Sequence, residues 1–374
     1  DSDADAAGVT GAVTLVSGES NLDIDAGLVA NPPPEAANDA LKLCAPGGTA
    51  MGQPTTGVAV VDVLANDTDD GALALAHLSD ADGSGTVTIS GVGDSITLAS
   101  GAVVTVVDEG DDGVFEFAYD SAGAVFAVDR DGGAEQVVAA DLLIGEQATD
   151  RFTYSIVDEN GAEATASVDV TICGAKNTLD TIAASLPDTL QFRIASTEAE
   201  GGFVDLTVSN SGDPRLDGLQ TDDAFCVDFS RDLEFGRDLD ANLYLADPDR
   251  VPDGVIQNEN NLDLVNWILN QDYRSIDNGD GAGETYNGNE IQAAIWFLLE
   301  DKEIDVPFFF PGTDENAQEI VDDAFANGEN FEAGEGDLVG LILDPLEATA
   351  PPEGAQPFII GVPFADLEQD CLCV

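Results

Sequence analysis

The stretch EIQAAIWFLLED, residues 290–301, and the shorter stretch AFCVD, residues 224–228, decide how the second half of the chain is expected to fold. The first predicts a helix that carries Gln292 in its first turn and buries Trp296. The second predicts a strand that carries Cys226. Strands before and after a helical block predict an α+β domain over residues 178–374.

The remaining elements of this domain follow from hydrophobic periodicity. NLDLVNWILNQ, residues 261–271, repeats its apolar residues at helical spacing, and a third helix over residues 315–327 is stopped by Gly328. Short apolar runs predict the strands, at residues 190–194, 203–209, 224–229, 338–343 and 358–362.

Residues 38–177 consist of short Val/Ile/Thr-rich segments, such as VAVVDVLAND and ATASVDVTI, separated by Gly, Asp and Asn. This spacing of strands and turns is typical of a β-sandwich. Cys44 precedes the first long segment and Cys173 follows the last. Because the first and last strands of a sandwich can run close together, we expect a Cys44–Cys173 disulfide, which is plausible outside the cytoplasm. The whole chain is therefore expected to be mostly β.

Residues 1–30 alternate polar and apolar residues in two short segments, and the stiff sequence NPPPE lies in a linker over residues 31–37. A β pattern this short cannot fold alone, so its partner strands belong to a preceding piece of the protein or to another chain, as in strand donation. Asp1, Asp3 and Asp5 are spaced like oxygen ligands of calcium, and the alternative is a solvated acidic loop.

Composition limits the class of partner. The 374 residues include 11 Lys and Arg against 74 Asp and Glu, which gives a net charge of −63, while a hydrophobic share of 44% indicates folded domains. Nucleic acid and anionic membranes would be repelled. No apolar run is long enough to insert into a membrane. Such an acidic surface suits high salt or abundant divalent cations, and we expect a secreted or cell-surface protein.

The types of residue present give little support for an enzyme. Five scattered cysteines do not form a zinc motif, and the single histidine, His77, leaves no Ser-His-Asp or Cys-His relay. No pair among the acidic residues stands out as a glycosidase pair. We therefore expect a protein that is not an enzyme and requires no cofactor, with calcium as the one ion that its acidic loops could take.

FCVD at residues 225–228 and IQAAIW at residues 291–296 resemble the two signatures of the thioester domains of Gram-positive adhesins. The resemblance implies an internal thioester between the Cys226 sulfur and the Gln292 side-chain carbonyl, with Asp228 orienting the thiol. It also implies covalent capture of an amine-bearing surface protein or polymer. Chemically, a thiolate that attacks a carboxamide releases ammonia and leaves a more electrophilic acyl group.

Two further resemblances concern the first half of the chain. VDVLANDTDDG and ATDRFTYSIVDENGAEATASVDVTI, at the two ends of the sandwich region, resemble the cadherin-like, VCBS-type Ig repeats of large bacterial adhesins. Residues 1–30, with DSDAD and NLDIDAGL, resemble the closing strands of an SdrD B-type repeat. Both resemblances imply a stalk of β domains.

Other interpretations of these residues remain open. Cys226 can instead pair with Cys371 or Cys373, and Gln292 can serve as a helix-capping residue. In that case the chain is a structural subunit of an extracellular filament or matrix, built by strand donation between copies and crosslinked through cysteines. A filament subunit should polymerise, whereas an adhesin fragment should be monomeric.

Overall fold

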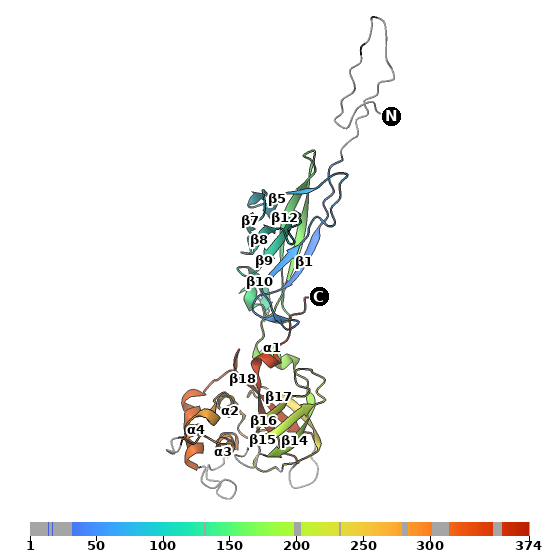
Figure 1. Ribbon diagram of the computed structural model, residues 1–374. Helices are drawn as coiled ribbons and strands as arrows, with labels where there is room; N and C mark the ends of the chain where they lie inside the picture. The colour runs from blue at the N-terminus through green and yellow to red at the C-terminus, as the bar shows by residue number, and fades with distance from the viewer. Residues whose placement is uncertain are drawn as a thin grey trace. The chain divides into compact units, whose positions relative to one another are not determined.

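The computed structural model describes residues 14, 17, 32–130, 132–197, 203–231, 233–278, 283–300, 314–346 and 354–373 (Figure 1). The chain divides into two compact units, one of Asp1–Lys176 with Cys371–Val374 and one of Asn177–Asp370. The domain boundary predicted after residue 177 lies next to this division, but the last four residues, expected in the second domain, belong to the first unit. Except for residues 14 and 17, residues 1–30 lie outside the described part, and with them Asp1, Asp3 and Asp5.

The first unit is a sandwich of two sheets, as its strand spacing predicts. One sheet has the order β1-β13-β12-β5-β6 and the other β4-β9-β8-β7. Its strands are β1 (Asp39–Cys44), β4 (Val58–Val61), β5 (Ala74–Asp80), β6 (Thr86–Thr88), β7 (Ser95–Thr97), β8 (Val103–Val107), β9 (Glu116–Asp120), β12 (Gln147–Val157) and β13 (Glu163–Cys173). Two hairpins add β2 (Thr49–Ala50), β3 (Gln53–Pro54), β10 (Val125–Arg130) and β11 (Gly133–Val138).

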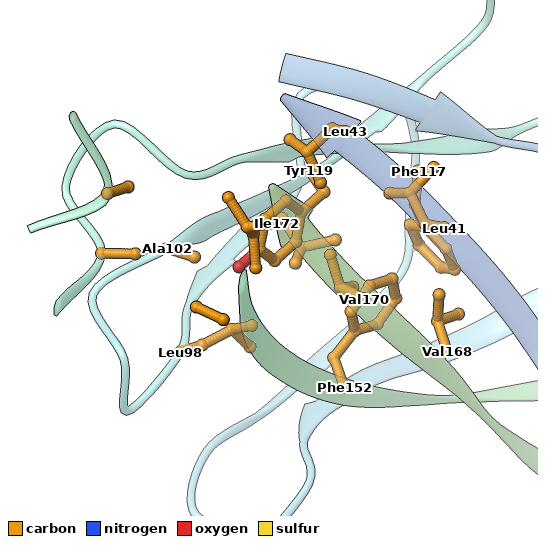
Figure 2. Close-up of a cluster of buried hydrophobic side chains, with 14 of the residues drawn as sticks. Leu41, Leu43, Leu98, Ala102, Phe117, Tyr119, Phe152, Val168, Val170 and Ile172 are labelled. Carbon is orange, nitrogen blue, oxygen red and sulfur yellow. The ribbon is translucent and has the colours of Figure 1, made fainter. Parts of the chain in front are cut away.

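Aromatic side chains from facing strands form the centre of this sandwich (Figure 2). Phe117 and Tyr119 alternate along β9, and Phe152 and Tyr154 alternate along β12, so that all four point into the core. The rings of Phe117 and Phe152 meet edge to face with centroids 5.7 Å apart. The buried Tyr119 hydroxyl donates to Asp150 Oδ2 at 2.7 Å, which satisfies its polar end.

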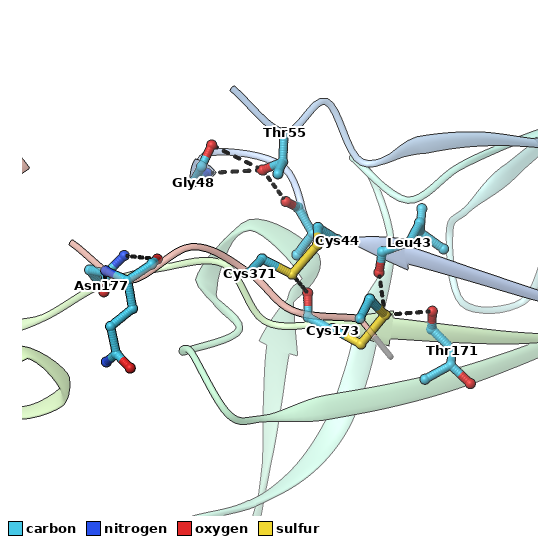
Figure 3. Close-up of a disulfide and its surroundings, with 11 residues drawn as sticks. Leu43, Cys44, Gly48, Thr55, Thr171, Cys173, Asn177 and Cys371 are labelled. Carbon is cyan, nitrogen blue, oxygen red and sulfur yellow. Dashed lines mark hydrogen bonds between the residues drawn. A yellow bond between two sulfur atoms is a disulfide. The ribbon is translucent and has the colours of Figure 1, made fainter. Parts of the chain in front are cut away.

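Two disulfides tie the end of the chain to the first unit (Figure 3). β1 runs parallel to β13 with Cys44 opposite Cys173, so the expected closeness of these two cysteines is confirmed. Their expected bond is wrong, because Cys44 pairs with Cys371 and Cys173 pairs with Cys373. The reason is the return of the chain: the Cys371 N–H donates to the Thr49 carbonyl at 2.7 Å and brings two further thiols to the ends of β1 and β13.

The second unit contains a closed barrel with the order β14-β15-β16-β19-β18-β17. The barrel strands are β14 (Thr189–Thr197), β15 (Val204–Ser209), β16 (Gln220–Cys226), β17 (Asp238–Leu245), β18 (Leu338–Pro345) and β19 (Phe358–Pro363). The predicted strands are confirmed, whereas β17 and the short helices α1 (Leu179–Ser185) and α5 (Phe364–Leu367) were not predicted.

Three helices lie together against one side of this barrel (Figure 1). α2 (Leu262–Leu269), α3 (Gly288–Glu300) and α4 (Asp314–Asn327) come between β17 and β18 in the chain, which confirms the predicted helical insertion. Alternation along the strands separates two cores. Ala224, Cys226 and Phe358 face the barrel interior, while Phe225 and Ile359 face the helices. The described residues as a whole are mostly β, as expected.

Candidate functional site

Cys226 is the last residue of β16 and points into the barrel core. β16 pairs with β19 in antiparallel register, with Cys226 opposite Phe358. The cysteine is 6% exposed and forms no disulfide. The alternative pairing of Cys226 with Cys371 or Cys373 is therefore wrong, because both of these cysteines are bonded within the first unit.

Gln292 lies on α3, whose residues are nearly all buried. It is the fifth residue of the helix, just past the first turn in which the sequence analysis expects it. Trp296 follows four residues later on the same helix face and packs in the barrel core with Cys226. Gln292 itself is 3% exposed, so its carboxamide must find hydrogen-bond partners within the protein.

The backbone of Cys226 supplies both of these partners. The Cys226 N–H donates to Gln292 Oε1 at 2.7 Å, and Gln292 Nε2 donates to the Cys226 carbonyl at 2.8 Å. A backbone N–H can only donate and a carbonyl can only accept, so the two ends of the carboxamide are unambiguous. The fold thus brings together Cys226 and Gln292 and fixes which atom of the carboxamide faces which group.

The thiol of Cys226 lies in an apolar environment that disfavours its charged form. Burial raises its pKa to about 12, although a hydrogen bond from the side chain of Gln356 acts in the opposite direction. Gln356 is 2% exposed and precedes β19, the strand beside Cys226. Sequence reasoning missed this glutamine, because no local pattern marks it and only the pairing of β16 with β19 brings it to the site.

Aromatic rings cover the site where β16 ends. The rings of Phe229 and Trp296 meet edge to face with centroids 5.0 Å apart. The Phe229 N–H donates to Glu300 Oε2 at 2.7 Å, which ties the turn after Cys226 to the end of α3. The strand that carries Cys226 and the helix that carries Gln292 are therefore connected at a second point.

Asp228 organises the turn that follows Cys226. Its Oδ1 accepts hydrogen bonds from the Ser230 N–H and hydroxyl, at 2.8 and 2.6 Å, and its Oδ2 lies 2.8 Å from Nε of Arg231. Burial alone would raise its pKa, but the Ser230 hydrogen bonds and the Arg231 charge outweigh it and hold the pKa of Asp228 below its usual value. An ionised carboxylate fits this turn, and the orienting role toward the Cys226 thiol stays a prediction.

A pocket of about 270 Å³ lies against the chain neighbours of the pair. Phe225 and Ile291, which directly precede Cys226 and Gln292, contribute to its lining. Tyr273 and Arg274 close another side, and the Arg274 guanidinium lies 3.7 Å from the centroid of the Phe203 ring. Tyr273 also meets Tyr286 edge to face, with centroids 5.3 Å apart.

Within the described residues, no group of three or more His, Cys, Asp or Glu side chains could hold a metal ion. No described helix is long and apolar enough to cross a membrane.

No protein-family model matches the chain, and no curated protein sequence matches it. Among solved structures, the chain is similar to the N-terminal thioester domain of a surface protein from Clostridium perfringens, with 11% identity and a TM-score of 0.32 over 46% of this chain and 99% of that one. It is also similar to an N-terminal thioester domain from a Clostridium perfringens surface protein in which alanine replaces a cysteine, with 10% identity and a TM-score of 0.30 over 46% of this chain and 98% of that one.

Proposed function

We propose that this chain is a cell-surface adhesin component whose second unit captures amine-bearing partners through an internal Cys226–Gln292 thioester. The observation that carries the proposal is the contact between the two residues: the carboxamide of Gln292 is held at both ends by the backbone of a residue with a free, buried thiol. A simple capping glutamine would bond its own helix end rather than a cysteine on another element.

The thioester forms by exchange of nitrogen for sulfur. The Cys226 sulfur bonds to Cδ of Gln292, the bond from Cδ to Nε2 breaks, and the thiol proton leaves with the nitrogen as ammonia. Nε2 is the end of the carboxamide that donates to the Cys226 carbonyl, so this hydrogen bond disappears with the leaving group. No oxidant and no cofactor enters the exchange.

The other hydrogen bond supports the reaction itself. Oε1 of Gln292 accepts from the Cys226 N–H at 2.7 Å, and this oxygen becomes negatively charged when a nucleophile adds to Cδ. A fixed backbone N–H aimed at such an oxygen stabilises the tetrahedral intermediate. The oxygen stays in place in the thioester, so the same donor serves both the formation of the bond and its later opening.

Burial explains how a reactive bond would persist. Cys226 and Gln292 are 6% and 3% exposed, which limits the access of water. An amine-bearing partner, such as a lysine side chain on a protein or polymer, would displace the sulfur and form an amide with Gln292. Each molecule would react once, so we propose capture rather than enzymatic turnover.

The cysteines and the charge support the proposed location. Disulfides persist in oxidising environments outside the cytoplasm, and the first unit holds two of them. A net charge of −63 suits an exposed, solvated surface in a saline setting. Both features favour a secreted or cell-surface protein.

The alternative function is a filament subunit whose copies are crosslinked through cysteines, and the structure leaves no exposed cysteine for such crosslinks among the described residues. The four cysteines other than Cys226 are bonded within one chain, and Cys226 is buried. Strand donation by residues 1–30 concerns a segment outside the described part of the chain. No contact among the described residues favours this second function.

Intact mass and a non-reducing peptide map, before and after methylamine, test the proposal. We expect the folded chain to lack one ammonia, a Cys226 peptide joined to the Gln292 peptide, and one methylamine added at Gln292 after treatment. Cys226→Ala should retain its ammonia and take up no methylamine. A folded wild-type chain with a free Cys226 thiol and an intact Gln292 carboxamide would show that the proposed function is wrong.

A further inference from the structure

A second cavity, of about 330 Å³, lies toward the end of the barrel that is remote from Cys226. Its lining includes Leu245, the last residue of β17, and Gly340, the third residue of β18. Cys226 lies opposite Phe358, which pairs with Leu343 toward the other end of β18. The cavity is therefore separate from the candidate site described above. Its volume falls at the lower end of the range for ligand pockets, which suits a small ligand.

Asn266 of α2 presents an unpaired acceptor at this cavity. Its Nδ2 donates to the Ala246 carbonyl at 2.7 Å, which fixes the side-chain amide, while its Oδ1 is buried and has no hydrogen-bond partner among the described residues. A Cβ at position 340 would lie 2.2 Å from this oxygen, so the glycine leaves room for the amide. A buried acceptor without a donor is destabilising, and both Asn266 and Gly340 line the cavity from which a ligand can supply that donor.

The other polar groups of the lining determine the charge that a ligand needs. Asp247, Asp249, Asp263 and Glu332 contribute carboxyl groups, and no Lys, Arg or His is among the described lining residues. Oδ2 of Asp263 accepts from the Asn330 N–H at 2.7 Å, which holds the loop that carries Glu332 against α2. These charges repel an anion and attract a cation. Since no group of side chains in the described part of the chain could hold a metal ion, the cation that fits is an organic one.

The distribution of these groups favours a ring over a simple alkylamine. The polar lining comes from three segments of the chain, namely residues 247–249, α2 and residues 330–332. Phe331 adds an aromatic ring, and Leu245 and Val339 add apolar surface. An alkylamine carries its donors at one end only. A sugar ring carries donors around its edge and apolar C–H groups on its faces, which matches a cavity that combines apolar surface with a few polar groups.

We infer that this cavity binds an amino-sugar unit reversibly. The ammonium group of the sugar pairs with the carboxylates, a ring hydroxyl donates to Oδ1 of Asn266, and Phe331 contacts a face of the ring. This site does not depend on the thioester and gives the second unit a noncovalent mode of recognition. A polymer of amino sugars carries amines along its whole length, so one polymer chain offers groups both to this cavity and to the proposed thioester.

The first experiment measures reversible binding alone. The full chain with Cys226→Ala cannot form the thioester, and NMR titration at about 0.15 M NaCl limits attraction at long range. The probe is the β-1,4-linked disaccharide of glucosamine with free amines. Cellobiose lacks the amines, and n-butylamine lacks the ring. We expect saturable binding of the glucosamine disaccharide and at least about tenfold weaker binding of the other two, since each loses hydrogen bonds or the charge that strengthens them.

Variants in the same Cys226→Ala background separate the cavity from general attraction by a chain of net charge −63. Asn266→Leu removes the unpaired acceptor without changing the net charge, and we expect about 10- to 100-fold weaker binding. Glu332→Gln removes one lining charge and should weaken binding about 2- to 5-fold, as for an exposed ion pair. Glu335→Gln is the matched control, because Glu335 is also exposed, lies three residues further along and does not line the cavity. It should bind as the parent chain does.

Each result supports or overturns the inference. Equal affinity of the parent chain and Asn266→Leu would assign the binding to general attraction and overturn the site, as would a parent chain that does not bind the disaccharide. Binding of cellobiose or n-butylamine as tight as that of the disaccharide would overturn the amino-sugar class. If Asn266→Leu does not fold, equal affinities of Glu332→Gln and Glu335→Gln contradict the site. Failure of the thioester test changes none of these expectations, because every chain used here lacks Cys226.

Discussion

The indole of Trp296 and the ring of Phe229 meet edge to face, with centroids 5.0 Å apart, one helical turn beyond Gln292. Trp296 comes from the helix that carries the glutamine, and Phe229 comes from the turn after the strand that carries the cysteine. The contact therefore joins the two elements at the site and covers it with apolar surface. A thioester depends on such cover, because water competes with amines for the same carbon.

Loosening this contact should expose the proposed thioester to hydrolysis. We expect Phe229→Leu to shorten the lifetime of the thioester roughly 2- to 10-fold, as follows from the strength of an edge-to-face pair. The measurement is the rate at which the intact mass gains one water. Phe297→Leu is the matched control, since Phe297 lies on the same helix but packs in the other core. Equal hydrolysis rates in both variants would contradict the covering role of Phe229.

The Cys226 thiol should resist alkylation when no thioester protects it. In a Gln292→Ala variant, burial that raises the thiol pKa to about 12 lowers the thiolate fraction near neutral pH by about a thousandfold relative to an exposed thiol. Labelling by iodoacetamide should therefore be slow at pH 8 and rise about tenfold per pH unit up to the pKa. Rapid labelling of the folded variant at pH 8 would show that the thiol is neither buried nor protonated.

The same pKa has a consequence for stability. A group whose pKa is higher in the folded state holds its proton more tightly there, so its contribution is constant below the unfolded thiol pKa and is lost as the pH rises toward about 12. The Gln292→Ala variant should accordingly lose stability through this alkaline range. Addition of Cys226→Ala should remove that part of the loss, which thermal unfolding at several pH values would detect.

Reduction should act on the first unit and leave Cys226 and Gln292 of the second unit unaffected. The disulfides Cys44–Cys371 and Cys173–Cys373 join residues 327 and 200 positions apart, and loss of a native disulfide typically lowers the unfolding free energy by roughly 2–5 kcal/mol. We expect the Cys44→Ala, Cys371→Ala double variant to unfold at lower denaturant concentration and still to take up methylamine. Loss of methylamine uptake in a variant whose second unit stays folded would contradict this separation.

Salt should stabilise the chain. Because the net charge is −63, the acidic side chains repel one another. Raising NaCl from about 0.1 M to about 1 M shortens the distance over which this repulsion acts from about 10 Å to about 3 Å. The melting temperature should rise over this range. A matched series with millimolar CaCl2 at constant ionic strength separates screening from calcium binding, including any binding at Asp1, Asp3 and Asp5. A melting temperature that does not respond to NaCl would rule out self-repulsion as an important destabilising force.

The elements of the second unit show what the sequence can predict. The three inserted helices α2, α3 and α4 and five of the six barrel strands follow from local periodicity. β17 was missed although Leu239, Ala241, Leu243 and Leu245 alternate with polar residues along it, so the signal was present. The closure of the barrel could not be predicted, because it depends on β17 pairing with β14 at one edge and with β18 at the other.

Some residues of the candidate site could likewise be predicted from the sequence, and others could not. Cys226 and Gln292 were predicted from two motifs, and the structure brings them together. Gln356 could not be predicted, because its position depends on the register of β16 against β19. The predicted Cys44–Cys173 disulfide is wrong for a related reason. The closeness of β1 and β13 was inferred correctly, but the sequence around Cys371 and Cys373 does not indicate that these residues lie beside the two strands.

That return makes the second unit a covalent loop. The chain leaves the first unit after Lys176 and re-enters it at Cys371, where two disulfides fasten it to strands that lie side by side. A single break of the peptide chain anywhere between residues 177 and 370 leaves both fragments attached to the first unit. A partner bonded to Gln292 would then stay tethered after one proteolytic cut, and only a cut combined with reduction would release it.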